Sequence, residues 1–281
     1  MLPLDRFLRK FLVSMQKTLS ANAYDFAYID KGEGPPLVFV HGSLLDYRYW
    51  LGEVDVFADA FRTIALSRRH HWPNRHPGKP GTFCYKAADH TDDVIAFLDA
   101  LACGPVHLVG HSYGGYIGAR LACLRPDLLK SLVLVEPGGP VEGEVLGRPR
   151  VKDHDKAATM VAAGDLEGGV AHFLDTLGPK RRWRDSAEAF KSMTLSNAVT
   201  ITEQTREIRP TLRADALAAL SCPTLLMIGA KSVSPFPETI AQFEQLIPRT
   251  RVATVTDASH MVNQDNPAGF QAVLRDFLVN L

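Results

Sequence analysis

The stretch that decides the fold runs Val106-His107-Leu108-Val109-Gly110-His111-Ser112-Tyr113-Gly114-Gly115. Its first half is a short apolar run that predicts a strand, Val106–Gly110, and the small apolar residues behind it predict a helix, Tyr113–Leu124. Between them lies the pattern Gly-x-Ser-x-Gly, which at a strand-to-helix turn raises the serine above the carboxyl edge of a sheet. Ser112 is therefore the predicted nucleophile.

The glycines of this pattern have a steric reason. A serine on so sharp a turn sits in a strained conformation, and side chains at the flanking positions would collide with neighbouring backbone. The same turn puts the next backbone N–H, that of Tyr113, at a helix N-terminus, where it can stabilise an oxyanion. The alternative is a strand-to-helix turn that merely contains a serine.

Short apolar runs and helical patterns alternate over most of the chain, which is typical of an α/β fold with a mainly parallel sheet flanked by helices. The further predicted strands are Leu37–His41, Thr63–Ser67, Ser131–Glu136, Thr224–Gly229 and Arg251–Thr256, with Tyr24–Asp30 as an antiparallel edge. The further predicted helices are Asp89–Ala102, Pro237–Leu246 and Pro267–Val279.

The alternation breaks once, between about Gly138 and about Leu220, where only helical patterns occur. This stretch is too long for a structureless loop in a compact domain. The sequence therefore predicts an α/β core, residues 1–137 and 221–281, with an inserted helical cap, residues 138–220.

The N-terminus carries apolar residues at helical spacing, namely Leu4, Phe7, Leu8, Phe11, Leu12, Met15 and Leu19. Ala21-Asn22-Ala23 resembles the cleavage site of a secretory signal, but Arg9 and Lys10 leave too short an apolar region before it. We expect an amphipathic helix that caps its own core or that of a partner, and attachment to a membrane surface is the alternative.

The composition is that of an ordinary globular protein of 281 residues, 46% hydrophobic and 22% charged. Lysine plus arginine equals aspartate plus glutamate at 31 each, so no overall field favours nucleic acid, and a small, largely uncharged substrate is expected. No apolar run approaches the roughly 20 residues of a membrane span. The scattered cysteines, Cys84, Cys103, Cys123 and Cys222, predict buried free thiols in a reducing compartment. We expect a cytoplasmic protein, either a monomer or a homodimer.

A serine hydroxyl is a weak nucleophile at neutral pH and needs a base beside it. Among ten histidines, His260 follows the last predicted strand and precedes the final helix, so its loop emerges at the same sheet edge as Ser112. His260 is therefore the predicted base, and a purely structural histidine is the alternative.

The chain resembles the α/β-hydrolase-fold superfamily over nearly its whole length. His41-Gly42-Ser43-Leu44 is similar to the family's oxyanion loop, Gly110–Gly115 to its nucleophile elbow, and Ser259–Pro267 to its histidine loop. The resemblance implies a roughly eight-stranded, mostly parallel sheet and a triad of serine, histidine and an acid. It also implies that the backbone N–H groups of Ser43 and Tyr113 form the oxyanion hole.

The acid of the triad is where this sequence departs from the family pattern. Members usually carry an aspartate after the penultimate strand, in a segment like Gly-x-x-Asp, but here Ser232 stands at that position. A neutral hydroxyl cannot stabilise an imidazolium. Some members, certain lactonases and dehalogenases among them, keep the acid after the neighbouring strand, where this chain has Glu136. We predict Glu136 as the acid and Asp257 as the runner-up; a Glu136 that only opens the cap is the alternative.

A second departure follows the strand Thr63–Ser67. Many members carry Asp-x-Arg-Gly-x-Gly-x-Ser there, whereas residues 67–75 of this chain read Ser-Arg-Arg-His-His-Trp-Pro-Asn-Arg. This segment could recognise a polar or acidic part of a substrate, or it could be a solvated loop held by its tryptophan. Phe173 and Trp183 of the predicted cap could line an apolar pocket for the substrate, although aromatic residues in a cap more often form its core. The candidate substrate-binding residues are Leu44, His71, Trp72, Phe173 and Trp183.

These residues together predict a serine hydrolase that cleaves a carboxylic ester or lactone through an acyl-enzyme, with no metal or organic cofactor. A serine nucleophile disfavours the dehalogenase and epoxide hydrolase chemistries, because those relatives use aspartate. The same triad also serves carbon–carbon bond hydrolysis, cofactor-free lyase or oxygenase reactions and acyl transfer, which stay open. A non-catalytic binding or receptor protein of this fold is the other alternative.

Overall fold

The computed structural model describes residues 16–75, 78–142, 151–178 and 182–281. Eight strands form one sheet in the order β1-β2-β4-β3-β5-β6-β7-β8. The strands are β1 (Gln16–Ala21), β2 (Tyr24–Lys31), β3 (Pro36–Val40), β4 (Arg62–Leu66), β5 (Val106–His111), β6 (Leu129–Val135), β7 (Thr224–Gly229) and β8 (Thr250–Val255). β2 pairs antiparallel with β1 and β4, and the other neighbouring strands pair in parallel. The sheet is mostly parallel, as the sequence predicts.

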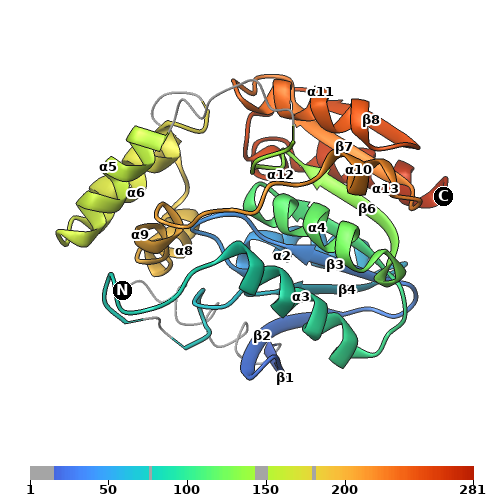
Figure 1. The fold of residues 1–281 in the computed structure, drawn as a ribbon, viewed down its shortest axis with the longest axis horizontal. Coiled ribbons are helices and arrows are strands. Elements are labelled where there is room, and N and C mark those ends of the chain that lie inside the picture. The colour runs from blue at the N-terminus through green and yellow to red at the C-terminus, as the bar shows by residue number, and fades with distance from the viewer. Residues whose placement is uncertain (1–15, 76–77, 143–150, 179–181) are drawn as a thin grey trace.

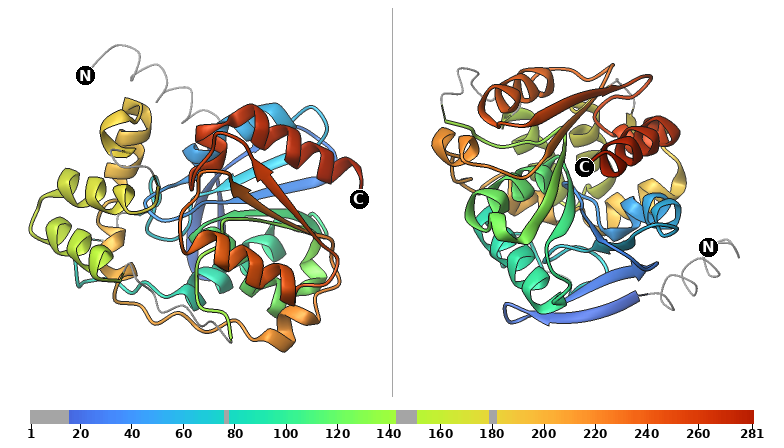
Figure 2. Two further views of the ribbon diagram at one scale, coloured as in Figure 1. Left: turned by 90° about the horizontal axis from the view of Figure 1, so that it is seen from above. Right: turned by 90° about the vertical axis from the view of Figure 1, so that its right-hand side faces the viewer.

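Helices cover both faces of this sheet (Figure 1, Figure 2). α3 (Ala87–Leu101), α4 (Tyr113–Leu124) and α11 (Phe236–Leu246) lie on one face, and α2 (Leu51–Phe57) and α13 (Pro267–Val279) lie on the other. Shorter helices are η1 (Tyr47–Trp50), η2 (Pro126–Leu128), α10 (Ala214–Ala218) and α12 (Val262–Asp265). None of the helices in the described ranges is long and apolar enough to cross a membrane.

The segment between β6 and β7 is helical, and most of its helices gather beyond one end of the sheet in Figure 1. They are α5 (Val151–Ala162), α6 (Leu166–Asp175), α7 (Arg182–Asp185), α8 (Glu188–Ser196) and α9 (Thr200–Gln204). In the described part of this segment, the only β pairing is an isolated bridge between Val141 and Leu212. The division of the chain into a core and a cap stays a prediction.

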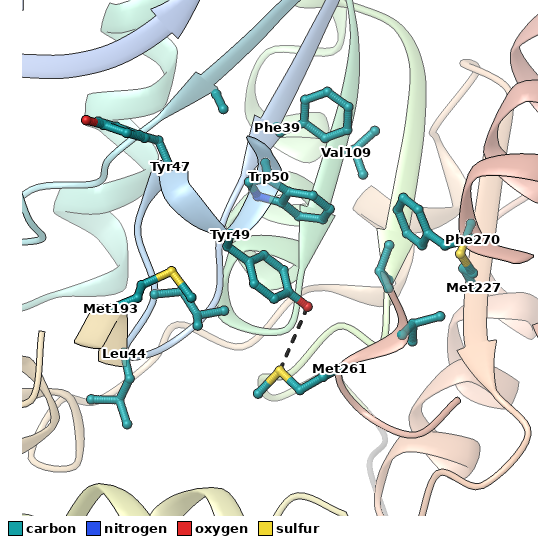
Figure 3. Close-up of a cluster of buried hydrophobic side chains, with 14 of the residues drawn as sticks. Phe39, Leu44, Tyr47, Tyr49, Trp50, Val109, Met193, Met227, Met261 and Phe270 are labelled. Atoms are coloured by element: carbon teal, nitrogen blue, oxygen red, sulfur yellow. Dashed lines mark hydrogen bonds between the residues drawn. The ribbon is translucent and has the colours of Figure 1, made fainter. Parts of the chain in front are cut away.

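Aromatic packing on the face of α2 and α13 anchors the loop that carries the predicted base (Figure 3). The Trp50 ring centroid lies 5.1 Å from that of Phe39 and 6.0 Å from that of Phe270. Beside it, the Tyr49 hydroxyl lies 3.8 Å from the sulfur of Met261. Because Met261 directly follows the predicted base, this apolar cluster fixes the base relative to the sheet.

The strands and helices predicted from the sequence all occur, with ends that differ by at most two residues. The N-terminus is different. Residues 1–15 of the expected amphipathic helix lie outside the described residues, but its last apolar position, Leu19, lies in β1. Asn22 and Ala23 have φ of 46° and 54°, as the two-residue turn of a β-hairpin requires. The helical prediction is therefore wrong for Leu19, because the turn and the pairing with β2 decide its conformation.

The four cysteines are free thiols, as expected, but their expected burial is wrong for three of them. Cys222 is buried, whereas Cys84 is exposed and both Cys103 and Cys123 are partly exposed. Cys84 precedes α3 and Cys103 follows it, so these two thiols lie in surface connections rather than in the packed interior.

Candidate active site

Ser112 lies on the turn between β5 and α4, at the carboxyl end of a central strand. Its backbone has φ 53° and ψ −114°, a rarely populated conformation of the kind that costs about 1–3 kcal/mol and persists only where the surroundings enforce it. The surroundings are tight, since a Cβ on Gly114 would lie 2.3 Å from the carbonyl oxygen of Val40. Only glycine fits there, and its absent side chain lets α4 approach the end of β3.

His260 stands between Ser112 and Glu136. Its Nε2 lies 3.0 Å from Ser112 Oγ, and its Nδ1 lies 2.8 Å from Glu136 Oε2. A carboxylate can only accept, so Nδ1 carries the hydrogen and Nε2 is free to accept the serine proton. His260 and Glu136 are 1% and 0% exposed, whereas Ser112 is partly exposed. The structure therefore brings together the three residues that the sequence singles out.

The Glu136 carboxylate is held by groups from the loop after β7. Its Oε1 accepts a hydrogen bond from the Gly229 N–H at 2.9 Å and another from the Ser232 hydroxyl. Ser232, which stands where the family usually has its acid, thus lies against the carboxylate that follows the neighbouring strand. On another side, the Phe236 ring stacks on the His260 ring with centroids 4.0 Å apart, which fixes the plane of the imidazole.

Asp257, the runner-up acid, points elsewhere. Its side chain is exposed and lies 2.8 Å from Lys231 Nζ, and this hydrogen bond lowers the pKa of the Asp257 carboxyl. The carboxylate on Nδ1 of His260 is that of Glu136. Asp257 braces its own loop, which is the role that its place three residues before the histidine suggests.

Ser43 and Tyr113, the predicted oxyanion-hole residues, belong to backbone that borders Ser112. Tyr113 begins α4, directly after Ser112, and Ser43 lies in the loop after β3. Gly42 brings that loop against the turn, since a Cβ at Gly42 would lie 3.1 Å from the Cβ of Ser112. Binding of an oxyanion by these two N–H groups stays a prediction.

Buried histidines lie behind this loop. Burial, with Arg68 as a second cause, holds the pKa values of His41 and His71 well below the usual value, so both rings are neutral near pH 7. His71 Nδ1 lies 2.6 Å from the carbonyl oxygen of Leu45, and its Nε2 lies 3.1 Å from the Tyr85 hydroxyl. Both ring nitrogens of this predicted substrate-binding residue are thus occupied by protein groups, so it supports the loop from behind.

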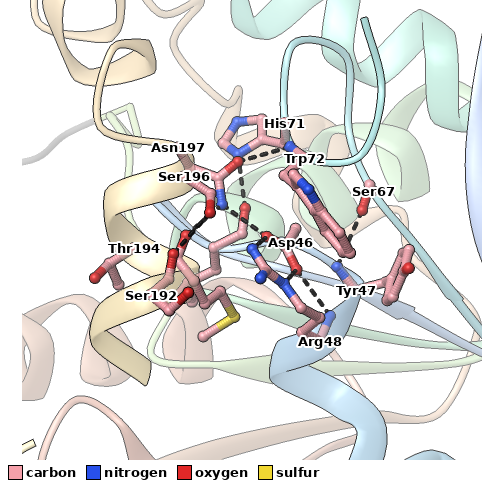
Figure 4. A network of polar contacts seen from close by, with 12 residues as sticks. Asp46, Tyr47, Arg48, Ser67, His71, Trp72, Ser192, Thr194, Ser196 and Asn197 are labelled. Atoms are coloured by element: carbon pink, nitrogen blue, oxygen red, sulfur yellow. Dashed lines mark hydrogen bonds and ion pairs between the residues drawn. The ribbon is translucent and has the colours of Figure 1, made fainter. Parts of the chain in front are cut away.

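Asn197, which ends α8, joins the helical segment to the loops around the site (Figure 4). Its Nδ2 donates to Asp46 Oδ2 at 2.8 Å, and its Oδ1 accepts from the Trp72 N–H at 2.7 Å. The Asp46 carboxylate also accepts two hydrogen bonds from the Arg48 guanidinium, which lies 3.9 Å from the Trp72 ring centroid. Trp72 is therefore held in place by this polar network.

Gln204, the last residue of α9, reaches the oxyanion loop itself. Its Nε2 donates to Ser43 Oγ at 2.8 Å, and its Oε1 accepts from the Tyr85 hydroxyl at 3.3 Å. A helix far along the chain thus contacts the residue that the resemblance assigns to the oxyanion hole.

The remaining predicted substrate-binding residues lie in one apolar cluster that extends from the sheet into the helical segment. Leu44 follows Ser43 with φ 61° and belongs to the same buried cluster as Met193 of α8; both are labelled in Figure 3. Phe173 is buried in α6, and the Trp183 Nε1 donates to Glu167 Oε1 at 3.1 Å. These side chains pack the helical segment together, and their contact with a substrate stays a prediction.

Three residues at the site are not singled out by the sequence: Arg68, Asn197 and Gln204. Nothing in the sequence separates Arg68 from Arg69, yet Arg68 is buried whereas Arg69 is partly exposed. Arg69 Nε pairs with Asp93 at 2.7 Å. The two amides belong to no motif. What marks the two amides is that each is a buried polar residue at the end of a helix, and burial cannot be read from a single sequence.

The assembled groups can perform nucleophilic chemistry. The hydroxyl can attack, the neutral imidazole can take its proton, and the carboxylate can stabilise the imidazolium. Within the described ranges, no group of three or more His, Cys, Asp or Glu side chains could hold a metal ion.

Proteins of known activity are similar to this chain over most of its length. It is 27% identical over 267 residues to the sn-1-specific diacylglycerol lipase ABHD11 of Mus musculus, across 87% of this chain and 81% of that protein. It is 25% identical over 278 residues to the (E)-2-((N-methylformamido)methylene)succinate hydrolase of Acinetobacter baylyi, across 94% and 98%. Among solved structures, a thermophilic esterase from Thermogutta terrifontis has the same fold, with a TM-score of 0.77 at 22% identity across 94% and 98%. The sequence profile of the alpha/beta hydrolase family matches residues 37–273, and the chain belongs to that family.

Proposed function

We propose that this protein is a serine hydrolase that cleaves a carboxylic ester or a lactone through an acyl-enzyme on Ser112. One observation carries the proposal: a continuous line of hydrogen bonds from the Ser112 hydroxyl through His260 to Glu136, at 3.0 Å and 2.8 Å. The hydroxyl is accessible, and the base and acid behind it are buried. An activated nucleophile needs this combination.

In the proposed reaction, His260 Nε2 takes the proton of Ser112 as the hydroxyl oxygen attacks the substrate carbonyl. The oxyanion rests on the backbone N–H groups of Ser43 and Tyr113. Glu136 stabilises the imidazolium, which then gives its proton to the leaving alcohol. A water molecule repeats the cycle on the acyl-enzyme, and the hydroxyl of Ser112 is restored.

We favour an ester or a lactone as the substrate class because an alkoxide leaving group needs less assistance from a general acid than an amine or a carbanion does. The relative from Mus musculus, named a lipase, supports this choice. The relative from Acinetobacter baylyi is named for a substrate with a formamido group, so hydrolysis at an amide-type carbon–nitrogen bond is the second candidate.

We also propose that the helices of residues 138–220 act as a cap over the site. Three hydrogen bonds support this role: one from Gln204 to Ser43, one from Asn197 to Asp46, and one from the Trp72 backbone N–H to Asn197. A cap of this kind limits access of water and shapes the substrate pocket.

The test combines a fluorophosphonate probe with a panel of p-nitrophenyl esters, lactones and N-acyl amides. We expect the wild-type protein to be labelled and to turn over at least one ester or lactone. Ser112→Ala should lose both, with a melting temperature close to that of the wild type. Folded wild-type protein that is never labelled would identify a binding protein. Labelling without turnover of any ester, lactone or amide would favour carbon–carbon hydrolysis, lyase chemistry or acyl transfer.

A further inference from the structure

A buried arginine lies directly behind the oxyanion loop. Arg68 is 1% exposed. Its Nη2 donates to the carbonyl oxygen of Gly42 at 2.9 Å, its Nε to that of His41 at 3.1 Å, and its Nη1 to the Tyr85 hydroxyl at 3.0 Å. Among the described residues no carboxylate forms an ion pair with it. A buried cation held only by neutral acceptors is costly to desolvate, so its place calls for a function.

A second donor reaches the same carbonyl. The Arg68 backbone N–H donates to His41 Nε2 at 2.9 Å, so this nitrogen is an acceptor. Because burial keeps the ring neutral, the hydrogen of His41 lies on Nδ1, which is 2.9 Å from the oxygen of Gly42. The Gly42 carbonyl therefore accepts one hydrogen bond from a guanidinium and one from an imidazole.

The Gly42 carbonyl and the Ser43 N–H belong to one planar, trans peptide unit. Fixing the carbonyl oxygen with two donors fixes the direction of the N–H on the opposite side of that plane. Hydrogen bonds to the oxygen also polarise the peptide, which strengthens the N–H as a donor, most of all when one partner is charged. The unit borders the nucleophile, since a Cβ at Gly42 would lie 3.1 Å from Ser112 Cβ.

The Arg68 charge also lies over the side chain of Tyr113, the residue whose backbone N–H is the other predicted donor. Its guanidinium carbon is 4.6 Å from the ring centroid of Tyr113. Arg209 lies 4.4 Å from the same centroid, but its charge is paired with Glu207 through a 2.7 Å hydrogen bond. Of these two guanidinium groups, Arg68 is the one that has no carboxylate partner among the described residues.

We propose that Arg68 is a positioning residue of the oxyanion hole, which orients and polarises the Gly42–Ser43 peptide for the negative oxygen of the tetrahedral intermediate. The inference rests on the proposed serine-hydrolase function. A fixed charge that polarises a donor peptide in a dry environment strengthens that donor most where negative charge develops, so it stabilises the transition state more than the ground state. Its loss should therefore lower kcat and leave KM almost unchanged.

The test uses Arg68→Met, which keeps roughly the length of the side chain but removes its charge and its hydrogen-bond donors, and Arg68→Lys, which keeps the charge but loses the planar fork that reaches three acceptors at once. The matched control is Arg69→Met, because Arg69 pairs with Asp93 at 2.7 Å and has no contact with the oxyanion loop among the described residues. Three quantities are measured for each folded variant: kcat and KM on the best ester, the Ki of a trifluoromethyl ketone, and the pH profile of kcat/KM. The ketone adds to Ser112 and carries the negative oxygen of the tetrahedral state.

Removal of a whole oxyanion donor typically costs about 100- to 1,000-fold in kcat, and Arg68→Met leaves the donor in place but weakened, so we expect a loss of about 10- to 100-fold. The ketone should bind more weakly by a similar factor, while KM and the shape of the pH profile stay as in the wild type. The kcat and the ketone Ki of Arg68→Lys should lie between those of Arg68→Met and the wild type. Both quantities should be the same in Arg69→Met as in the wild type. A purely structural role would not move ketone affinity and kcat together.

The inference is refuted if folded Arg68→Met keeps the kcat and the ketone Ki of the wild type. Should that variant not fold, Arg68→Lys decides, and wild-type values in Arg68→Lys refute it. An inactive, unlabelled wild type is a different outcome, because it refutes the proposed function and this inference with it. An active wild type with an equally active Arg68→Met refutes the inference alone.

Discussion

Ser112 lies between two loops that carry opposite charge. On the acid side, the buried carboxylate of Glu136 is held by the Gly229 N–H and the Ser232 hydroxyl, and it faces His260. On the oxyanion side, the buried guanidinium of Arg68 is held by carbonyl oxygens and a tyrosine hydroxyl. Each charge is surrounded by neutral groups, and each is placed on the side where the opposite charge would appear in the proposed reaction.

This difference between the two sides matches what an acyl transfer demands. When the proton leaves the serine, a cation forms on the imidazole and an anion forms on the substrate oxygen. A carboxylate behind the first and a guanidinium behind the second stabilise the charge-separated state without reorganisation. Substitutions on the two sides should therefore affect the reaction in different ways.

The largest effect is expected on the acid side. Glu136→Gln keeps the shape of the side chain but cannot stabilise the imidazolium or impose the reactive tautomer, so kcat should fall by about 10,000-fold, as for the acid of other triads. Asp257→Asn is the matched control, since Asp257 is exposed and pairs with Lys231. It should change kcat by less than about twofold. The reverse ranking in steady-state kinetics would remove Glu136 from the triad.

Moving the carboxylate from position 136 to position 232 tests whether the acid must follow β6 or whether any carboxylate beside His260 is sufficient. Because Ser232 touches the Glu136 carboxylate, a carboxylate introduced at 232 should occupy the same small volume beside His260. Glu136→Ser should be almost inactive, and the double variant Glu136→Ser with Ser232→Asp should recover about 10- to 100-fold of kcat, since the general-base step regains its ion pair. No recovery in a folded double variant would mean that the loop after β7 cannot present an acid.

A third prediction compares Glu136 with a buried carboxyl that has no ion-pair partner in the part of the chain that the structure describes. Glu53 on α2 is 2% exposed, and burial raises its pKa from 4.5 to about 7, although the Asn263 amide donates to it at 3.2 Å. Its pKa is higher in the folded state than in the unfolded state, so the folded state binds more protons between these values. Its contribution to stability is present at low pH and is lost as pH rises through about 7.

For Glu53 this linkage amounts to about 2 kcal/mol of unfolding free energy between pH 5.5 and pH 8.5. Urea unfolding at both pH values should show the loss in the wild type and not in Glu53→Gln, whose other titrating groups are the same. Parallel pH dependence in the two proteins would mean that Glu53 is not neutral in the fold at pH 5.5 or is charged at little cost.

The sequence predicts one side of the site better than the other. Ser112, Glu136 and His260 each follow a strand of the parallel sheet, so local patterns place all three at one edge. The contacts of Arg68 and Gln204 depend instead on how a loop and a distant helix fold over β3, and no periodicity encodes that. The same limit explains β1, where pairing with β2 overrides the helical spacing of the apolar residues at Leu19.

The smallest effect is expected where the helical segment meets the oxyanion side. Gln204 donates to Ser43 Oγ at 2.8 Å and accepts from the Tyr85 hydroxyl at 3.3 Å, and Gln204→Leu removes both hydrogen bonds while preserving volume. Only the first of them touches the oxyanion loop, and the Gly42 carbonyl keeps its bonds to Arg68 and His41. We therefore expect kcat to fall by only about fivefold, in line with the loss at that loop of one neutral hydrogen bond worth about 1 kcal/mol. The control is Gln242→Leu on α11, which should leave kcat unchanged.

A loss of kcat in Gln204→Leu as large as that in Arg68→Met would mean that the helical segment, and not the buried charge, sets the geometry of the oxyanion loop. Equal activity of Gln204→Leu and the wild type would mean that Arg68 and His41 position the oxyanion loop without help from the helical segment.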